Sequence, residues 1–375
     1  MAGSEEGPLK VPCPIGHAVL AGLAVAPIFL PVPVNFNIVA TAAATVYVGS
    51  RRSVKDSPPQ DSMTKRDAAK FPLIGSVVLF SLFLAFKYLP KDWVNAVLAG
   101  KLEVFPVISK TGCWGAEPAY FVLLGLLALT ATADPLVAPF LPRKLSETQF
   151  HFTVMKIPVL LKEGLEFSFS PLEIVLSAAA ALFSAWYLKQ RHWFASNVLG
   201  LAFSLQGIEH LSLGSVAVGV ILLAGLFFYD IFWVFFTPVM VSVAKNFDAP
   251  IKLLFPRFLQ DAEGKEQFSM LGLGDIVIPG IFVAIVLRYD IAHGRQTRFF
   301  RSSFLGYVVG LTATIMVMNA FKAAQPALLY IVPSVFLFTL AAAALKGKGS
   351  GRMYLLLTLL QWAARYLPLP GTLFD

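Results

Sequence analysis

Charged residues, cysteines and the common hydrolase motifs are scarce or missing in this 375-residue chain. Only 14% of the residues are charged, about half to two thirds of the share in an ordinary soluble protein. The two cysteines, Cys13 and Cys113, lie far apart, so neither a disulfide framework nor a metal site is indicated. No HExxH motif supplies zinc ligands, and the lack of G-x-S-x-G argues weakly against serine chemistry.

Long apolar runs are abundant instead. Hydrophobic residues make up 57% of the chain and aromatic residues 13%. A helix of about 20 apolar residues crosses the hydrocarbon core of a bilayer. We therefore predict an all-α polytopic membrane protein with about nine transmembrane helices. The apolar runs lie at about 16–49, 71–89, 120–141, 171–188, 193–209, 216–236, 271–287, 303–321 and 326–345.

The first run, 16–49, is longer than one span and contains Pro27, Pro31 and Pro33. We expect it to kink or to include a partly re-entrant piece, because neighbouring helices can satisfy the carbonyls that prolines free. The residues before it are acidic where a cleaved signal would be basic, so this run is predicted to stay as an anchor.

Basic residues predict the orientation of the chain. The net charge is +8, but no basic stripe with interleaved aromatics occurs, so nucleic acid is not an expected partner. Lys and Arg gather at 50–70, 288–302 and 346–352, which share one side if there are nine spans. The positive-inside rule makes that side cytosolic. The N-terminus is then lumenal and the C-terminus cytosolic, although the basic segment 189–192 falls on the opposite side.

The runs divide the chain into consecutive segments rather than separate folded domains. Segment 145–170 alternates polar and apolar residues in places and is predicted to be a connector with strand character. The predicted order is a lumenal tail (1–15), spans one to six (16–236), a lumenal loop (237–270), spans seven to nine (271–345) and a C-terminal tail (346–375).

Two aspartates lie inside predicted spans. Asp230 is the only ionisable acid of the sixth span, and Asp275 lies near the start of the seventh. A charged side chain at mid-membrane costs about 2.5 to 3.5 kcal/mol on insertion scales, and such residues usually face the protein interior and have a function. The two spans are neighbours joined by one loop, so both carboxyls are expected at a similar depth below the lumenal surface.

Small and helix-breaking residues accompany these aspartates at the same predicted depth. Gly272 and Gly274 flank Leu273 just before Asp275, and the segment Gln325-Pro326-Ala327-Leu328 opens the ninth span. Glycines there would let a substrate backbone approach. Close helix packing would explain the glycines equally well, and proline in the first turn of a helix is ordinary.

A pair of carboxyls in a low dielectric keeps one proton between them, which is the arrangement that activates water against an amide. The same pair could instead form the ion site of a proton-coupled transporter. Tyr229, beside Asp230, is either a core residue or a hydrogen-bond partner of the acid. The residues alone leave these alternatives open.

At these positions the sequence resembles the signal peptide peptidase family of intramembrane aspartic proteases, within the wider presenilin-like group. Tyr229-Asp230 matches the family's YD motif, Gly272-Leu273-Gly274-Asp275 its GxGD motif, and Pro326-Ala327-Leu328 its PAL motif. Each motif is weak alone, but their order within nine apolar runs is specific. Stretches such as HWFASNVLGLAFSLQGIE and MLGLGDIVIPGIF extend the similarity over most of the chain.

The resemblance implies a presenilin-like helical fold and an enzyme of the endoplasmic reticulum membrane that works without metal or cofactor. Its substrates would be remnant signal peptides and type II or tail-anchored segments, cut within their transmembrane helices. Asp230 and Asp275 would be catalytic. The glycine motif, Tyr229 and the Gln325–Leu328 segment would shape the site. Homo-oligomers and membrane quality-control partners are left open by the resemblance.

The sequence departs from the family's pattern in two places. Segment 101–119 is inserted before the third span, and the tail after Gly347 is apolar and lacks a dilysine retrieval signal. The tail could lie in the membrane interface as an amphipathic helix. A homologue that binds transmembrane helices without cutting them is therefore a further alternative, although intact aspartates argue against it.

Overall fold

The structure is a computed structural model that describes residues 14–55, 62–88, 119–138, 150–154, 165–237, 251–260, 266–294, 297–321 and 325–346. Both cysteines, most of segment 101–119 and the tail beyond Lys346 lie outside these residues, so the predictions for them stay predictions.

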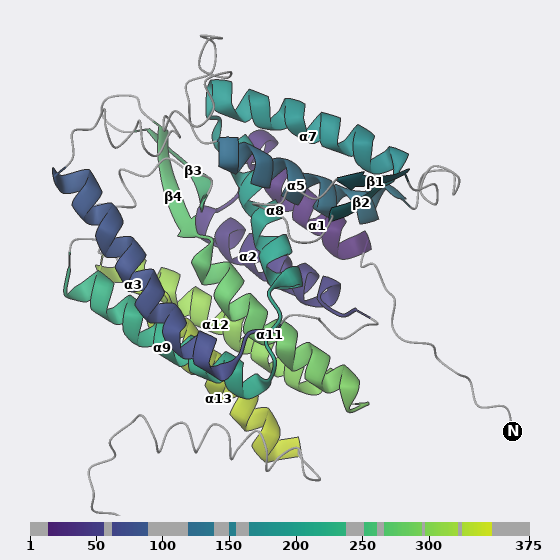
Figure 1. Ribbon diagram of the computed structural model, residues 1–375. Coiled ribbons are helices and arrows are strands. Elements are labelled where there is room, and N and C mark those ends of the chain that lie inside the picture. The colour runs from purple at the N-terminus through teal and green to yellow at the C-terminus, as the bar shows by residue number, and fades with distance from the viewer. Residues whose placement is uncertain are drawn as a thin grey trace, which may run out of the picture.

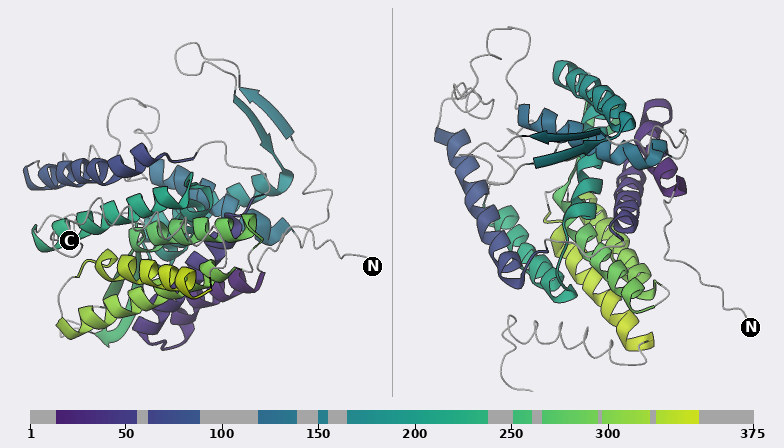
Figure 2. Two further views of the ribbon diagram at one scale, coloured as in Figure 1. Left: turned by 90° about the horizontal axis from the view of Figure 1, so that it is seen from below. Right: turned by 45° about the vertical axis from the view of Figure 1, so that its right-hand side comes forward.

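Helices dominate the described part of the chain, which confirms the predicted fold class (Figures 1 and 2). Three of them, α7, α9 and α12, are long and apolar enough to span a membrane, and shorter apolar helices accompany them. The described helices are α1 Pro14–Phe29, α2 Val34–Arg52, α3 Lys65–Tyr88, α5 Ala119–Val137, α7 Pro171–Gln190, α8 Trp193–His210, α9 Val216–Phe235, α11 Gly274–Ala292, α12 Arg298–Phe321 and α13 Leu328–Lys346.

The first apolar run forms two helices rather than one. Helix α1 ends at Phe29 and α2 begins at Val34, with Pro31 and Pro33 in the break, where missing N–H groups prevent continuous helix. The two helices pack against each other. Helix α1 has 16 residues, about 24 Å, which is less than the roughly 30 Å hydrocarbon core.

Helix α11 forms the centre of the bundle. It packs against α2, α8, α9 and α12, and every residue from Ile281 to Leu287 is buried. A helix that is apolar on all sides is expected to be surrounded by other elements. Because Asp275 lies in its first turn, a helix enclosed by other described helices carries one of the two aspartates.

Two small antiparallel hairpins interrupt the helices. Strands β1 (Phe150–Val154) and β2 (Leu165–Phe169) form the first, where the connector was predicted to have strand character. Strands β3 (Lys252–Gln260) and β4 (Glu266–Gly272) form the second and lead directly into α11. The predicted loop 237–270 therefore contains a strand pair, and Asp275 follows a strand rather than an earlier helical turn.

A partly buried arginine, Arg52, links α2, α5 and α8. Pro135 in α5 has no N–H, so the carbonyl of Ala131 loses its helical donor. The Arg52 guanidinium donates to the carbonyl oxygens of Ala131 (2.8 Å) and Thr132 (3.3 Å). Its Nε donates to Glu209 at 2.7 Å. A charged side chain thus satisfies a main-chain group that a proline has freed.

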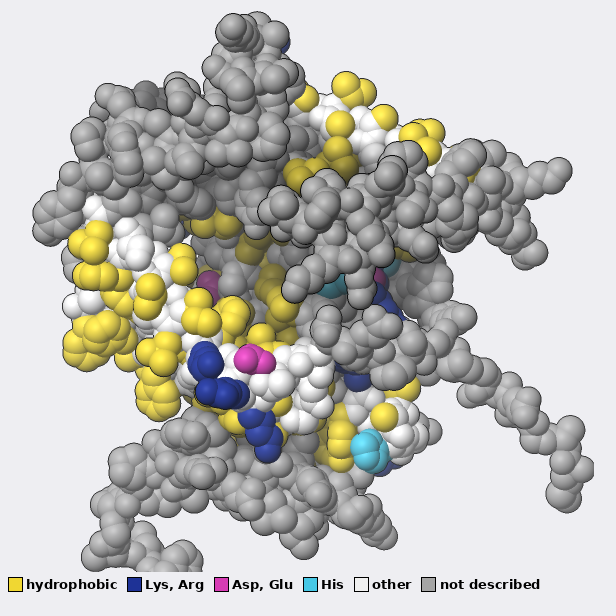
Figure 3. Space-filling view, viewed as in Figure 1, with side chains coloured by type: hydrophobic (Ala, Val, Ile, Leu, Met, Phe, Trp, Pro, Cys, Tyr) yellow, Lys and Arg dark blue, Asp and Glu magenta, His cyan; other side chains and the backbone are white. Residues whose placement is uncertain are grey.

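Helices α3 and α9 pack side by side along one flank of the molecule (Figures 1 and 2). Hydrophobic side chains gather over them in the space-filling view (Figure 3). Several of their large apolar side chains are exposed, including Leu73, Val77 and Phe232. Lipid rather than water is the medium that suits such a surface.

Candidate active site

Asp230 lies on α9 and is buried, with only 5% of its surface exposed. Its Oδ2 accepts a hydrogen bond of 3.0 Å from the main-chain N–H of Leu328, which is the first residue of α13. The N-terminus of a helix carries unsatisfied N–H groups and a partial positive charge. The start of α13 therefore binds the carboxyl of Asp230 and fixes its position.

Asp275 lies at the junction of strand β4 and helix α11. The Leu273 N–H donates to the carbonyl of Ile251 at 3.0 Å, and the Leu273 carbonyl accepts from Val277 at 2.8 Å. The hydroxyl of Tyr307, a fully buried residue of α12, donates to the main-chain carbonyl of Asp275 at 3.3 Å. Strand, helix and tyrosine together hold the main chain on both sides of this aspartate.

The two aspartates lie on neighbouring helices. Helices α9 and α11 pack against each other, and the carboxyls of Asp230 and Asp275 are close enough to interact electrostatically. Asp230 is enclosed, whereas Asp275 is partly exposed. The described residues contain no group of three or more His, Cys, Asp or Glu side chains that could hold a metal ion. The chemistry that these side chains offer is acid and base chemistry.

The glycines before Asp275 leave its carboxyl accessible. Gly272 and Gly274 are both exposed. A Cβ added at Gly272 would lie 3.4 Å from Oδ2 of Asp275. A larger side chain there would extend across the carboxyl, so the bare backbone keeps open the approach to the acid.

The Pro326-Ala327-Leu328 segment is buried beneath α12. Thr314 of α12 donates to the carbonyl of Gly310 at 2.9 Å and also approaches the carbonyl of Ala327 at 3.4 Å. The side chain of Gln325 accepts a hydrogen bond from the Tyr330 hydroxyl at 3.4 Å. These contacts hold the segment against α12, while its Leu328 N–H donates to Asp230.

Tyr229 faces another helix. Its ring lies beside Gly75 of α3, where an added Cβ would be 3.6 Å from Cε2 of Tyr229. The centroids of the Tyr229 and Trp233 rings are 6.3 Å apart. The hydrogen bonds of the described residues include none between Tyr229 and either aspartate. In this structure Tyr229 is a packing residue between α3 and α9.

Two residues that hold the site were missed by sequence reasoning: Tyr307 and Thr314. Each is a buried polar side chain in an apolar helix. A buried amide or hydroxyl in a membrane helix needs a hydrogen-bond partner, so the polarity of these residues was a usable signal. The identity of each partner depends on packing between distant segments.

The helices and the paired acids define a polytopic membrane protein with an acidic site inside its bundle. The family model described as signal peptide peptidase matches residues 55–350. The chain is 40% identical to the signal peptide peptidases of Mus musculus and Homo sapiens over 321 residues, covering 83% of this chain and 80% of each relative. It is 32% identical to intramembrane protease 2 of Caenorhabditis elegans over 380 aligned residues, covering 77% and 81%. The chain belongs to the signal peptide peptidase family, whose members are intramembrane proteases.

Proposed function

We propose that this protein is an aspartic endopeptidase that cuts transmembrane segments within the bilayer, with Asp230 and Asp275 as its catalytic residues. The observation that carries the proposal is the pairing of two carboxyls on the packed helices α9 and α11, one of which accepts a hydrogen bond from the Leu328 N–H at the start of α13. Remnant signal peptides and type II or tail-anchored segments are the proposed substrates. The names of the mammalian relatives support the first of these.

The chemistry follows from two carboxyls in a low dielectric. Close carboxyls cannot both ionise there, so one keeps its proton while the other acts as a base. The base takes a proton from water, and the acid protonates the carbonyl oxygen or the leaving amine. The two acids titrate as a pair, so the roles belong to the pair. No metal or cofactor is needed for these steps.

A helical substrate must be unwound before its amide can be attacked, because its main-chain groups are paired internally. Strand β4 offers an alternative partner. In an antiparallel pair, alternate residues direct their N–H and C=O groups away from the partner strand. The hydrogen bond from Leu273 to Ile251 shows that the odd-numbered residues of this segment face β3. The N–H and C=O groups of Phe268, Met270 and Gly272 therefore point away from β3.

An extended substrate could therefore add to the free edge of β4, as peptides add to exposed sheet edges elsewhere. Within the described residues β4 pairs with β3 alone. The edge ends at Gly272, beside the Asp275 carboxyl. Strand addition would place an unwound amide next to the acids, which favours substrates with helix-weakening residues. Equal cutting of leucine-rich and glycine-containing helices would contradict this.

We place the enzyme in the endoplasmic reticulum membrane with a lumenal N-terminus and a cytosolic C-terminus. The charge pattern of the loops supports the orientation. Because the first apolar run forms two helices, the side of the N-terminus depends on whether α1 crosses the bilayer. Tags at each end, tested for protease accessibility in sealed microsomes, would decide it.

The test is cleavage of a signal-peptide substrate by the purified full-length protein, with product masses from mass spectrometry. Asp230→Asn and Asp275→Asn are each expected to lower the rate by about 10²- to 10⁴-fold, the usual contribution of an acid or base. Asp67→Asn, an exposed aspartate paired with Thr64, is the matched control and should leave the rate unchanged.

A folded wild type that makes no product would reject the proposal. Proteoliposomes would then distinguish the alternatives. Proton-coupled flux that Asp275→Asn abolishes would indicate a transporter. Binding of transmembrane peptides without flux or cleavage would indicate a homologue that acts by binding alone.

A further inference from the structure

The second hairpin has two edges, and among the described residues only one of them is closed. Asn197 of α8 lies beside the outer edge of β3, with 6% of its surface exposed. Its Nδ2 donates to the carbonyl of Leu254 at 2.7 Å, and its Oδ1 accepts from the N–H of Leu254 at 2.7 Å. One side-chain amide thus binds both main-chain groups of a strand residue, as a neighbouring strand would.

The rest of this edge is closed by the sequence itself. Pro256 follows Leu254 by two residues, so its nitrogen lies on the same edge, and it has no N–H to donate. The main-chain groups of Leu254 are occupied by Asn197. An added strand would find no free donor on either residue, whereas the corresponding residues of β4, Met270 and Phe268, keep theirs.

The same helix face also contacts the motif before Asp275. A Cβ added at Gly200, one turn after Asn197, would lie 2.9 Å from Leu253 and 3.3 Å from Leu273. Leu273 is in turn bonded through its N–H to Ile251, just before β3. Helix α8 therefore contacts β3 and the residue that follows β4, close to the point where α11 begins.

We propose that Asn197 is a positioning residue that closes the outer edge of β3, so that an extended substrate joins β4 in a single register beside Asp275. This inference rests on the proposed function. Asn197 acts through the main chain of the hairpin and does not contact the aspartates in the described contacts.

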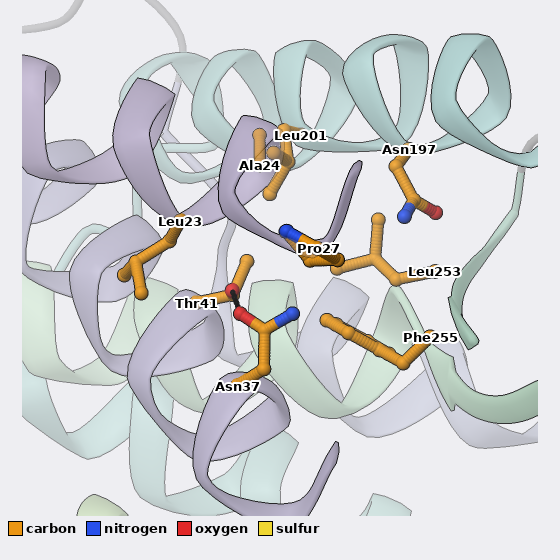
Figure 4. Close-up of a pocket in the computed structure, with 9 residues that line it drawn as sticks. All are labelled: Leu23, Ala24, Pro27, Asn37, Thr41, Asn197, Leu201, Leu253 and Phe255. Atoms are coloured by element: carbon orange, nitrogen blue, oxygen red, sulfur yellow. Dashed lines mark hydrogen bonds between the residues drawn. The ribbon is translucent and has the colours of Figure 1, made fainter. Parts of the chain in front are cut away.

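The pocket beside Asn197 provides a matched control. Asn197 and Asn37 line the same small pocket, of about 10 Å³, between α1, α2, α8 and β3 (Figure 4). Asn37 is equally buried, but its amide accepts a hydrogen bond from Thr41 of its own helix. Replacing either asparagine by leucine removes a buried amide, but only Asn197→Leu removes the hydrogen bonds to β3.

The experiment compares wild type, Asn197→Leu, Asn37→Leu and Asp275→Asn on one signal-peptide substrate, with rates normalised to folded protein. We expect kcat/KM of Asn197→Leu to fall about 10- to 100-fold below that of Asn37→Leu, the usual cost of a misplaced reacting group. Its products should also spread over several cleavage positions. Asn197→Gln, which keeps the amide, should restore part of the cleavage at the single wild-type position.

A variant that merely loses folded protein would keep the wild-type cleavage position, and that result overturns the proposal. Hydrogen exchange gives a second measurement even if activity is too low. The Leu254 amide should exchange at least about tenfold faster in Asn197→Leu than in Asn37→Leu, because its acceptor is gone. Equal exchange rates would also overturn it. A wild type without cleavage, or an active Asp275→Asn, rejects the proposed function first and this inference with it.

Discussion

The two hairpins share a topology but differ in what surrounds them. Strands β1 and β2 pair over five residues each and pack mainly against each other. Strands β3 and β4 pack against α8, α2 and α11. Strand β4 ends at Gly272, two positions before α11 begins at Gly274. The first hairpin extends outward from the helices (Figure 2), whereas the second lies beside α8 at the end of α11 (Figure 1).

This difference shows that a hairpin becomes part of a site through its attachments. An isolated two-stranded hairpin is marginally stable. The second one is held by the Asn197 amide, by the buried side chains of Leu253 and Phe255, and by the bond from Leu273 to Ile251. We expect activity to depend strongly on changes around the second hairpin and hardly at all on changes in the first.

Outside the two aspartates, the largest effect is expected from Gly272→Val at the end of β4. The Cβ of the added side chain would lie 3.4 Å from Oδ2 of Asp275, and its methyl groups would block the approach of substrate. We expect cleavage to fall at least about 100-fold with little change in thermal stability, because Gly272 is exposed. Gly22→Val in α1 is the control, since a Cβ there meets nothing within 4 Å. Comparable losses in both variants would contradict the steric argument.

The next effect concerns the contact of α12 with α13. A Cβ at Gly310 would lie 2.6 Å from Cα of Ile331, so small residues let the two backbones approach. Gly310→Leu should force the helices apart, lower the unfolding free energy by about 1 to 3 kcal/mol or more, and shift the Leu328 N–H away from Asp230. Thermal unfolding and cleavage, measured on one preparation, should both decline. Full activity would mean that this packing does not position Leu328.

Arg52→Met should lower stability without changing the chemistry. It leaves the Ala131 carbonyl without its donor and leaves Glu209 with Lys55, at 3.5 Å, as its remaining ion-pair partner. We expect a loss of about 1 to 3 kcal/mol for the group that loses its partner. Activity per folded molecule should be unchanged, because the arginine lies away from the aspartates. Adding Pro135→Ala restores an N–H to that carbonyl and should recover part of the melting temperature. If the two substitutions changed the melting temperature additively, Arg52 would not be compensating for the N–H that Pro135 lacks.

The smallest effect is expected in the first hairpin. His151 and Ser168 are cross-strand partners in β1 and β2. Replacing both by alanine should leave cleavage within about twofold, because the described strands of this hairpin pack mainly against each other. A clear loss of activity in this variant would show that the first hairpin contributes to the site after all.

Local patterns predicted much of the architecture. Apolar runs identified the helices because a bilayer requires about 20 apolar residues per span, and nearly every run coincides with a helix. The break between α1 and α2 followed from Pro31 and Pro33, but whether the chain would kink or separate into two helices could not be decided locally. Both outcomes satisfy the same residues, and packing against neighbouring helices selects one.

The sequence by itself determined that this is a helical membrane protein with two aspartates in neighbouring spans, because burying a charge in lipid is costly enough to make its position informative. Tertiary structure alone decided that α13 binds Asp230 through Leu328, that Tyr229 turns to α3, and that Asn197 closes one edge of the hairpin. These contacts join residues between about 50 and 150 positions apart, and no local periodicity encodes which distant groups will pair.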